Sequence, residues 1–325
     1  MAAHDVRQIQ GSARGGIGAT VAGGAARGDE GSGRTALVVE GGGMRGVFAA
    51  GVLDAFAACG FAPFDLAVGT SAGAAALASH LAGQPGRNRR CLVGLMRRPE
   101  FVHPWHGPTR ALRGGHWMDL DWLFDACERD DPLDVAALLA CDVELVVAAT
   151  SADTGAPVYL VPRADDASLL IKASSALPVL YRGPVVVRGH RLVDGGVAAA
   201  IPVQEAYRRG ARRILVVRSR ATGISRQPGL EHCLGAFFAR GSPALARAIW
   251  RSPAAYQATL DFIADPPSDC TIVEVAPPAP LATGRTTRQL ATLERDYALG
   301  RASGEDAVVR WAHSLAASRS AARVA

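Results

Sequence analysis

Three short segments of the sequence carry residue types that could together hydrolyse an ester, and the first contains a serine. In Gly69-Thr70-Ser71-Ala72-Gly73, Ser71 has a glycine two residues away on each side, which is the spacing of a nucleophile elbow. The segment follows the apolar residues 66–68 and precedes the helix-prone residues 74–78. A serine in such a turn lies near a helix N-terminus, where unpaired N–H groups favour a developing negative charge. We therefore predict that Ser71 is a nucleophile. Because 36 of the 325 residues are glycine, this prediction depends on the other two segments.

The second segment is the glycine-rich run Gly41-Gly42-Gly43-Met44-Arg45-Gly46, which follows a predicted strand and opens a predicted helix. Small residues at such a junction let several backbone N–H groups converge on one point and form an anion site. In an acyl hydrolase the anion is the carbonyl oxygen of the substrate as it becomes an oxyanion. The run therefore predicts an oxyanion hole at Gly42, Gly43 and Arg45.

The same run permits a second interpretation, as a loop that binds the phosphates of a dinucleotide. Gly41, Gly43 and Gly46 match the G-x-G-x-x-G fingerprint, which needs an acidic residue about 20 positions later at the end of the second strand. Asp65 is near that position but precedes its strand. The oxyanion interpretation is favoured for this reason, and a dinucleotide- or phosphate-binding protein remains the alternative.

The third segment offers a base for the serine. Asp194 follows the predicted strand 191–193 and is backed by Gly195 and Gly196, so its carboxylate would be held at a strand end with room for close approach. A partly dry environment can raise the pKa of an aspartate enough for general-base catalysis. Histidine is the commoner partner of a serine nucleophile. A Ser-Asp-His triad esterase thus stays open, with three candidate histidines after Ser71: His190, His232 and His313.

With these three motifs in this order, the chain resembles the patatin-like phospholipase family, and in particular a bacterial branch of it. A fourth block, residues 173–178, is also similar to that family. The resemblance implies a lipid acyl hydrolase of the phospholipase A, lysophospholipase or esterase kind, with a Ser-Asp dyad and neither metal nor cofactor. It also implies that Ser71 is the nucleophile, Asp194 the base, and Gly42, Gly43 and Arg45 the oxyanion loop. Glu40 stands where the family often has aspartate. The glycines that the motifs require are Gly41, Gly46, Gly69, Gly73, Gly195 and Gly196.

Strands and helices must alternate to position these residues. Apolar runs predict strands at the following ranges: 36–40, 66–68, 143–150, 157–161, 185–187, 191–193, 214–217 and 271–275. Helical spacing predicts helices between them, of which the longest cover about 230–264 and 286–317. The order indicates an α/β protein with a mainly parallel sheet covered on both faces. The resemblance makes this a three-layer α/β/α sandwich.

Composition divides the chain into three regions. Residues 1–34 are rich in Gly, Ala, Ser and Arg without periodicity, which predicts a disordered N-terminal extension. We expect a patatin-like catalytic domain over 35–220, in which residues 84–134 form a helical and loop excursion. A C-terminal extension over 221–325, with helices and a strand, should pack on the catalytic domain.

Charge and cysteine usage narrow the class of protein further. The net charge of +5 comes almost wholly from arginines, which are scattered along the chain, and only 6% of residues are aromatic. No nucleic-acid motif accompanies them, so we expect no nucleic-acid partner. The six cysteines show neither a C-x-x-C pair nor the spacing of a zinc site, which is typical of a reducing compartment.

The sequence has no secretory h-region and no uncharged apolar run of about 18–20 residues, so a cytoplasmic protein is expected. Transient contact with a membrane surface is compatible with two features. One is the helical stretch 244–262, and the other is a group of aromatic residues that could line a lid over the site or belong to the core: Trp105, Trp117, Trp122 and Phe124.

Overall fold

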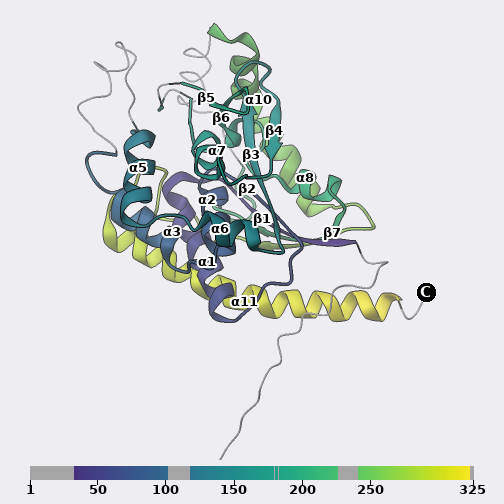
Figure 1. The fold of residues 1–325 in the computed structure, drawn as a ribbon. Coiled ribbons are helices and arrows are strands. Elements are labelled where there is room, and N and C mark those ends of the chain that lie inside the picture. Colours follow the sequence, from purple (N-terminus) through teal and green to yellow (C-terminus); the bar gives the residue numbers. More distant parts are fainter. Residues whose placement is uncertain (1–32, 102–117, 179, 182, 226–240, 323–325) are drawn as a thin grey trace, which may run out of the picture.

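The computed structural model describes residues 33–101, 118–178, 180–181, 183–225 and 241–322, and within these ranges it contains one eight-stranded sheet (Figure 1). The hydrogen-bonded path through it is β5-β6-β3-β2-β1-β7-β8, and β4 also pairs with β3. The strands are β1 (Arg34–Val39), β2 (Leu66–Thr70), β3 (Glu144–Ser151), β4 (Pro157–Leu160), β5 (Val185–Val187), β6 (His190–Asp194), β7 (Ala211–Val217) and β8 (Thr271–Val275).

Five of these strands, from β3 through β2, β1 and β7 to β8, run parallel to one another. Their apolar side chains are buried on both faces and fall into two clusters by alternate residues. Val39 and Leu37 of β1 face one cluster with helices α1 (Gly46–Ala58), α2 (Ala72–Leu81) and α7 (Ala167–Ser174) and the end of α11 (Leu290–Ala322). Ala36 and Val38 face the other cluster with α8 (Val203–Arg208) and α10 (Pro243–Ala264). The prediction of a three-layer α/β/α sandwich is therefore confirmed.

The register of β3 brings two distant segments together. Ala148 pairs with Thr70 of β2 and with Tyr159 of β4, while the next residue, Ala149, pairs with Asp194 of β6 and again with β4. Because β4 occupies one edge of β3 from Val147 to Thr150, β2 and β6 must share the other edge and meet end to end. The last residue of β6 therefore follows directly on the last residue of β2.

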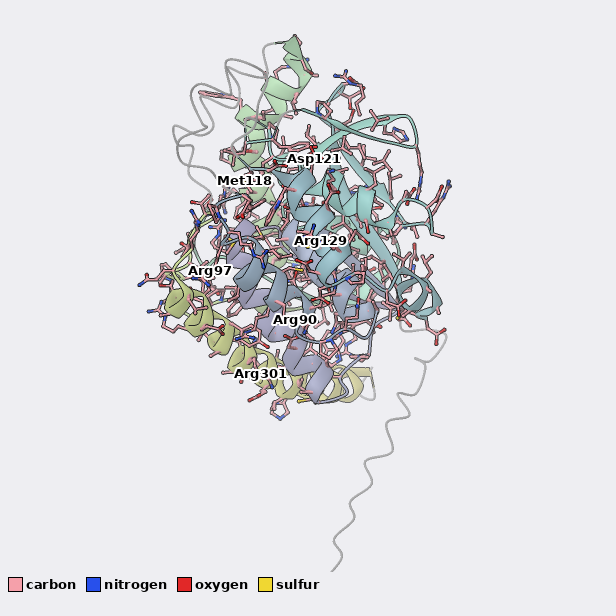
Figure 2. The ribbon with its side chains drawn as sticks, turned by 60° about the vertical axis from the view of Figure 1, so that its left-hand side comes forward. Arg90, Arg97, Met118, Asp121, Arg129 and Arg301 are labelled. Atoms are coloured by element: carbon pink, nitrogen blue, oxygen red, sulfur yellow. The ribbon has the colours of Figure 1, made fainter. Side chains whose placement is uncertain are left out.

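Short helices between α2 and β3 in the sequence pack against α1 and α2 (Figure 2). In that view Arg90 marks α3 (Arg87–Arg90), Arg129 marks α5 (Leu120–Asp130), and Arg301 marks α11 below them. The other short elements are η1 (Gly43–Arg45), the π-helical turn η2 (Cys91–Leu95), α6 (Val135–Ala140) and η3 (Gly195–Val197). The predicted excursion over 84–134 corresponds to α3, η2 and α5, with 102–117 outside the described residues.

Helix boundaries differ from the predicted ones in the C-terminal region. The helix predicted at about 230–264 is α10, which begins at Pro243 because the preceding Ser242 is extended; residues 226–240 lie outside the described ranges. The helix predicted at 286–317 is α11, which begins at Leu290. The predicted disordered extension lies outside the described residues up to position 32, and Arg34 already belongs to β1. Among the described helices, none is both long and apolar enough to cross a membrane.

Candidate active site

Ser71 occupies the sharp turn between β2 and α2, as its motif predicts. Its backbone has φ 54° and ψ −126°, and only one other non-glycine residue of the described chain has a positive φ. Such a conformation is strained and persists only where the surroundings enforce it. A Cβ on Gly73 would lie 2.5 Å from the carbonyl oxygen of Val39, so this position of the motif requires glycine. The turn is therefore fixed by close contact between α2 and the end of β1.

Ser174, the last residue of α7, holds the strained turn from the other side. Its hydroxyl accepts a hydrogen bond of 2.7 Å from the Ser71 N–H and donates one of 2.6 Å to the carbonyl oxygen of Ala148 in β3. The side chain is fully buried, so no solvent water replaces these contacts. Sequence reasoning assigned no role to Ser174, although it belongs to the block 173–178 that resembles the family.

The serine and the aspartate of the first and third motifs are in direct contact. Ser71 Oγ donates a hydrogen bond of 2.8 Å to Oδ2 of Asp194, and both residues are more than nine-tenths buried. The other carboxylate oxygen, Oδ1, accepts a bond of 2.6 Å from the N–H of Gly196. Thr150 donates to the backbone carbonyl of Asp194 at 2.9 Å. Asp194 is the last residue of β6 rather than the first residue after a strand. The N–H of Gly196 holds the carboxylate and the Thr150 hydroxyl holds the backbone of Asp194, and together they orient the carboxylate toward the serine.

The candidate histidines lie elsewhere. His190 is the first residue of β6, four positions before the aspartate, and is exposed. His313 is exposed on α11, and His232 lies outside the described residues. The serine hydroxyl donates to the carboxylate itself, without an imidazole between them.

The glycine-rich run forms the tight turn η1 between β1 and α1. The N–H of Gly41 donates to Ala200 at 3.1 Å, and the N–H of Met44 donates to the carbonyl oxygen of Arg285 at 3.2 Å. Within the described chain, neither the N–H of Gly42 nor the N–H of Gly43 donates a hydrogen bond to an acceptor. Arg45 makes a long contact of 3.5 Å with the carbonyl oxygen of Gly42. Two adjacent amides are therefore available to a ligand.

Two cavities meet at Ser71, and both are also lined by Gly43 and Leu177. The larger, with about 850 Å³ of empty space including its open mouth, has mostly apolar walls between α2, η2 and α5. Phe124 of α5 lines it, whereas Trp122 packs against the core, and Trp105 and Trp117 lie outside the described residues. The smaller, with about 480 Å³, is lined by Asp194, the glycine-rich turn and several charged side chains.

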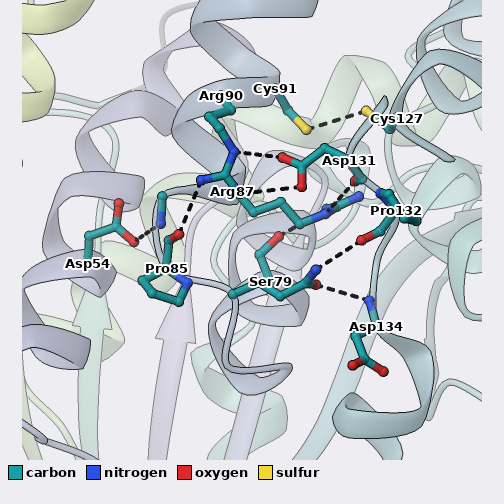
Figure 3. Close-up of polar contacts among 12 residues, drawn as sticks. Asp54, Ser79, Pro85, Arg87, Arg90, Cys91, Cys127, Asp131, Pro132 and Asp134 are labelled. Atoms are coloured by element: carbon teal, nitrogen blue, oxygen red, sulfur yellow. Dashed lines mark hydrogen bonds and ion pairs between the residues drawn. The ribbon is translucent and has the colours of Figure 1, made fainter. Parts of the chain in front are cut away.

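A network of hydrogen bonds supports the wall of the larger cavity (Figure 3). The buried guanidinium of Arg87 donates to the carbonyl oxygen of Asp131 at 2.9 Å and to Ser79 Oγ at 3.1 Å. Nearby, the sulfur atoms of Cys91 and Cys127 are 3.4 Å apart. The contact with Cys91, together with burial, raises the pKa of the Cys127 thiol, which therefore stays protonated. These contacts connect α3 and η2 to α5 across the cavity.

Charged residues surround the smaller cavity. Burial, followed by the nearby cations Arg220 and Arg285, lowers the pKa of Arg45 to about 10. Arg45 therefore keeps its charge at neutral pH. Within the described residues, His, Cys, Asp and Glu side chains form no group of three or more that could hold a metal ion.

Comparison with known proteins places the chain in a family. Residues 37–207 match the sequence profile described as patatin-like phospholipase, which spans all three motifs. The chain belongs to the patatin-like phospholipase family. The predicted resemblance is thereby confirmed, and the protein falls within a family of lipid acyl hydrolases. Residues 242–316 match a second profile, described as a domain of unknown function, DUF6363.

Two individual proteins also match the chain. The chain is 37% identical over 279 residues to the uncharacterized protein YjjU of Escherichia coli strain K12, covering 84% of this chain and 76% of that protein. Among solved structures, VipD from Legionella pneumophila matches with a TM-score of 0.42 and 12% identity, covering 86% of this chain and 67% of the VipD chain.

Proposed function

We propose that this patatin-like protein hydrolyses carboxylic esters of lipids through a Ser71–Asp194 dyad and an acyl-enzyme intermediate. The observation that supports the proposal is the 2.8 Å hydrogen bond from Ser71 Oγ to Asp194 Oδ2. That distance lies within the range over which a base takes up a proton as the oxygen attacks. The strained turn keeps the hydroxyl at the junction of the two cavities.

The reaction follows from these positions. Ser71 Oγ attacks the ester carbonyl carbon while its proton passes to Asp194 Oδ2. The carbonyl oxygen takes up negative charge opposite the N–H groups of Gly42 and Gly43, which stabilise it. The C–O bond to the alcohol then breaks, and the alcohol leaves with the proton from Asp194. Asp194 next deprotonates a water molecule, which attacks the acyl-serine carbonyl carbon. The bond between that carbon and Ser71 Oγ then breaks, the fatty acid leaves, and the proton passes from Asp194 back to Ser71 Oγ.

The two cavities give the two parts of an ester separate positions. An acyl chain fits the larger, mostly apolar cavity, because burial of each methylene group contributes about 0.8 kcal/mol. The alcohol part then lies in the smaller cavity beside Asp194. Family membership favours this use of the glycine-rich turn over the alternative, a dinucleotide-phosphate site.

The experiment compares hydrolysis of p-nitrophenyl butyrate and of a monoacylglycerol by the wild type and by Ser71→Ala and Asp194→Asn. We expect both variants to lose at least about 100-fold in kcat, since each removes one partner of the proton transfer. Asp153→Asn is the matched control, because Asp153 is an exposed carboxylate paired with Arg191. A fluorophosphonate probe followed by peptide mass spectrometry should label Ser71. Wild-type rates in either dyad variant would overturn the proposal, and loss of all activity in His190→Ala or His232→Ala would replace the dyad with a triad.

A further inference from the structure

Two cysteine thiols lie in contact in the wall of the larger cavity. Cys91 is the first residue of η2 and Cys127 belongs to α5, so the pair joins two elements that are distant in the sequence. Both residues line the cavity that reaches Ser71, and their sulfur atoms are 3.4 Å apart (Figure 3). A disulfide bond is about 2.05 Å long, so a small movement of the side chains would join them. The proposed ester hydrolysis uses neither thiol.

The surroundings make the two thiols chemically different. Cys127 stays protonated and donates its S–H to Cys91. That hydrogen bond, together with the positive charges of Arg87 and Arg90, lowers the pKa of the Cys91 thiol, although burial opposes the shift. The nucleophilic form of cysteine is the thiolate. Cys91 is therefore the nucleophile of the pair, and the protonated Cys127 is its neighbour.

A polar side chain without a partner lies beside Cys91. Asn88 is three residues earlier in the same helical segment, and residues at this spacing are neighbours on a helix surface. Asn88 also lines the larger cavity, and within the described chain its buried side-chain N–H₂ group has no hydrogen-bond partner. Cys91 begins a π-helical turn, a rare conformation that is frequent at functional sites. The cavity thus offers a nucleophile and a hydrogen-bond donor side by side.

These groups select the kind of molecule that could react with them. The walls around them are mostly apolar, with Leu92, Met96 and Leu123 among the lining residues. An apolar chain fits such walls, whereas a thiolate and an amide N–H₂ group suit an oxygen that can be attacked and an oxygen that accepts a hydrogen bond. A hydroperoxide group supplies both oxygens in adjacent positions.

We propose that Cys91 and Cys127 reduce a hydroperoxide in the larger cavity and are themselves oxidised to a disulfide bond. Cys91 Sγ attacks the terminal oxygen, the O–O bond breaks, and the other oxygen takes up the proton of the Cys91 thiol and leaves. It leaves as an alcohol, or as water when the oxidant is hydrogen peroxide. The sulfenic acid formed on Cys91 then condenses with the Cys127 thiol, which releases water. The hydroperoxide gains the two electrons that the thiols lose.

Two oxidants test the pair and distinguish the source of the hydroperoxide: hydrogen peroxide, and linoleic acid hydroperoxide in micelles of an uncharged detergent. Peptide mass spectrometry follows every cysteine of the reduced wild-type protein. We expect the Cys91–Cys127 disulfide to form at least about tenfold faster than the exposed Cys59 is oxidised. Faster reaction with the lipid oxidant identifies an oxidised acyl chain, and faster reaction with hydrogen peroxide identifies a small oxidant. If neither oxidant forms this disulfide faster than it oxidises Cys59, the inference is overturned.

Variants test the separate roles, with folding checked by circular dichroism. Cys127→Ser should leave Cys91 as a sulfenic acid that dimedone labels, whereas Cys91→Ser should leave Cys127 unlabelled. Asn88→Ala should slow disulfide formation about fivefold, as for one lost hydrogen bond. Cys59→Ser is the matched control and should form the disulfide at the wild-type rate. Equal labelling of Cys91 and Cys127 in the two single variants would contradict the assignment of the nucleophile.

The inference goes beyond the proposed function, and one variant separates the two. Ser71→Ala lacks the proposed nucleophile for esters but should form the Cys91–Cys127 disulfide at the wild-type rate. Disulfide formation in a protein that hydrolyses no ester would support the thiol pair and reject the proposed function. Ester hydrolysis by a wild type whose Cys91 and Cys127 stay reduced would do the reverse.

Discussion

Ser174→Ala is the substitution whose effect follows most directly from the structure. The Ser174 hydroxyl connects the N–H of Ser71 to the carbonyl oxygen of Ala148 and is fully buried. Alanine removes both hydrogen bonds but leaves the volume nearly unchanged. The loss of stability therefore measures the two hydrogen bonds with little contribution from packing.

The magnitude comes from the two groups left behind. The N–H of Ser71 lies in a buried turn and has no other acceptor among the described residues, so leaving it unpaired costs about 1–3 kcal/mol. The carbonyl oxygen of Ala148 belongs to a strand paired on both edges and loses one donor, at about 0.5–1.5 kcal/mol. We therefore expect the free energy of unfolding to fall by about 2–4 kcal/mol. The strained φ of Ser71 should relax as well, with a fall in kcat of roughly tenfold or more.

Equilibrium unfolding in urea, followed by circular dichroism, measures the first effect, and hydrolysis of p-nitrophenyl butyrate measures the second. Ser175→Ala is the control, since the adjacent hydroxyl donates only to the Ile171 carbonyl one turn earlier in the same segment. That substitution should change the free energy of unfolding by less than about 1 kcal/mol. If Ser174→Ala and Ser175→Ala unfold at the same urea concentration, Ser174 does not hold the turn and the reasoning is refuted.

Three further predictions concern the cavity walls and the dependence on pH. Ala75→Leu fills part of the larger cavity one turn after Ser71, so the ratio of kcat/KM for a long-chain to a short-chain p-nitrophenyl ester should fall at least about tenfold; an unchanged ratio would place the acyl chain elsewhere. Arg87→Gln removes buried hydrogen bonds to Asp131 and Ser79 and should lower the free energy of unfolding by about 2–3 kcal/mol in urea, whereas the exposed Arg129→Gln should have little effect. Burial lowers the pKa of His80 below its ordinary 6.5, so the unfolded chain binds a proton that the folded chain does not. The melting temperature should therefore fall as pH drops below about 6.5, and His80→Gln should flatten that slope; equal slopes would contradict the assignment.

The sequence predicted those parts of the structure that are determined by residues close to one another in the chain. The strand, glycine turn and helix around Ser71 are neighbours in sequence, so their types and order predict the elbow without further information. Apolar runs of the same kind predicted all eight strands within a few residues. The glycine-rich run 41–46 and the motif Asp194-Gly195-Gly196 were also recognised from their spacing alone. Their roles remain predictions, which the variants described above test.

The features that could not be predicted from the sequence depend on contacts between residues that are far apart in the chain. The end-to-end arrangement of β2 and β6 along β3 joins residues 70 and 194 through the register of a third strand, and no local pattern encodes it. Arg220 and Arg285 resemble the many other arginines of the chain until the fold gathers them in one cavity. Tyr256 had one local signal, an aromatic residue on the buried face of a helix. The sequence is compatible with contact between that helix and a membrane surface, which stays a prediction, and a helix that packs on a partner is favoured over it; in the structure its tyrosine is buried against Glu40 and its Trp250 is exposed.

The dependence of the site on the C-terminal region has a physical origin in the packing of α11 on α1. A Cβ on Gly300 would lie 2.1 Å from the carbonyl oxygen of Phe48, and one on Gly51 would lie 2.2 Å from that of Tyr297, so only glycine allows the two helices to approach this closely. Helix α1 begins at the end of the glycine-rich turn, and α11 begins shortly after Arg285. The helix contact therefore helps to set the distance between the glycine-rich turn and the backbone of Arg285, whose carbonyl oxygen accepts the N–H of Met44. Any shift of α11 should therefore move Arg285 and, through the hydrogen bond from the N–H of Met44 to the Arg285 carbonyl oxygen, the glycine-rich turn as well.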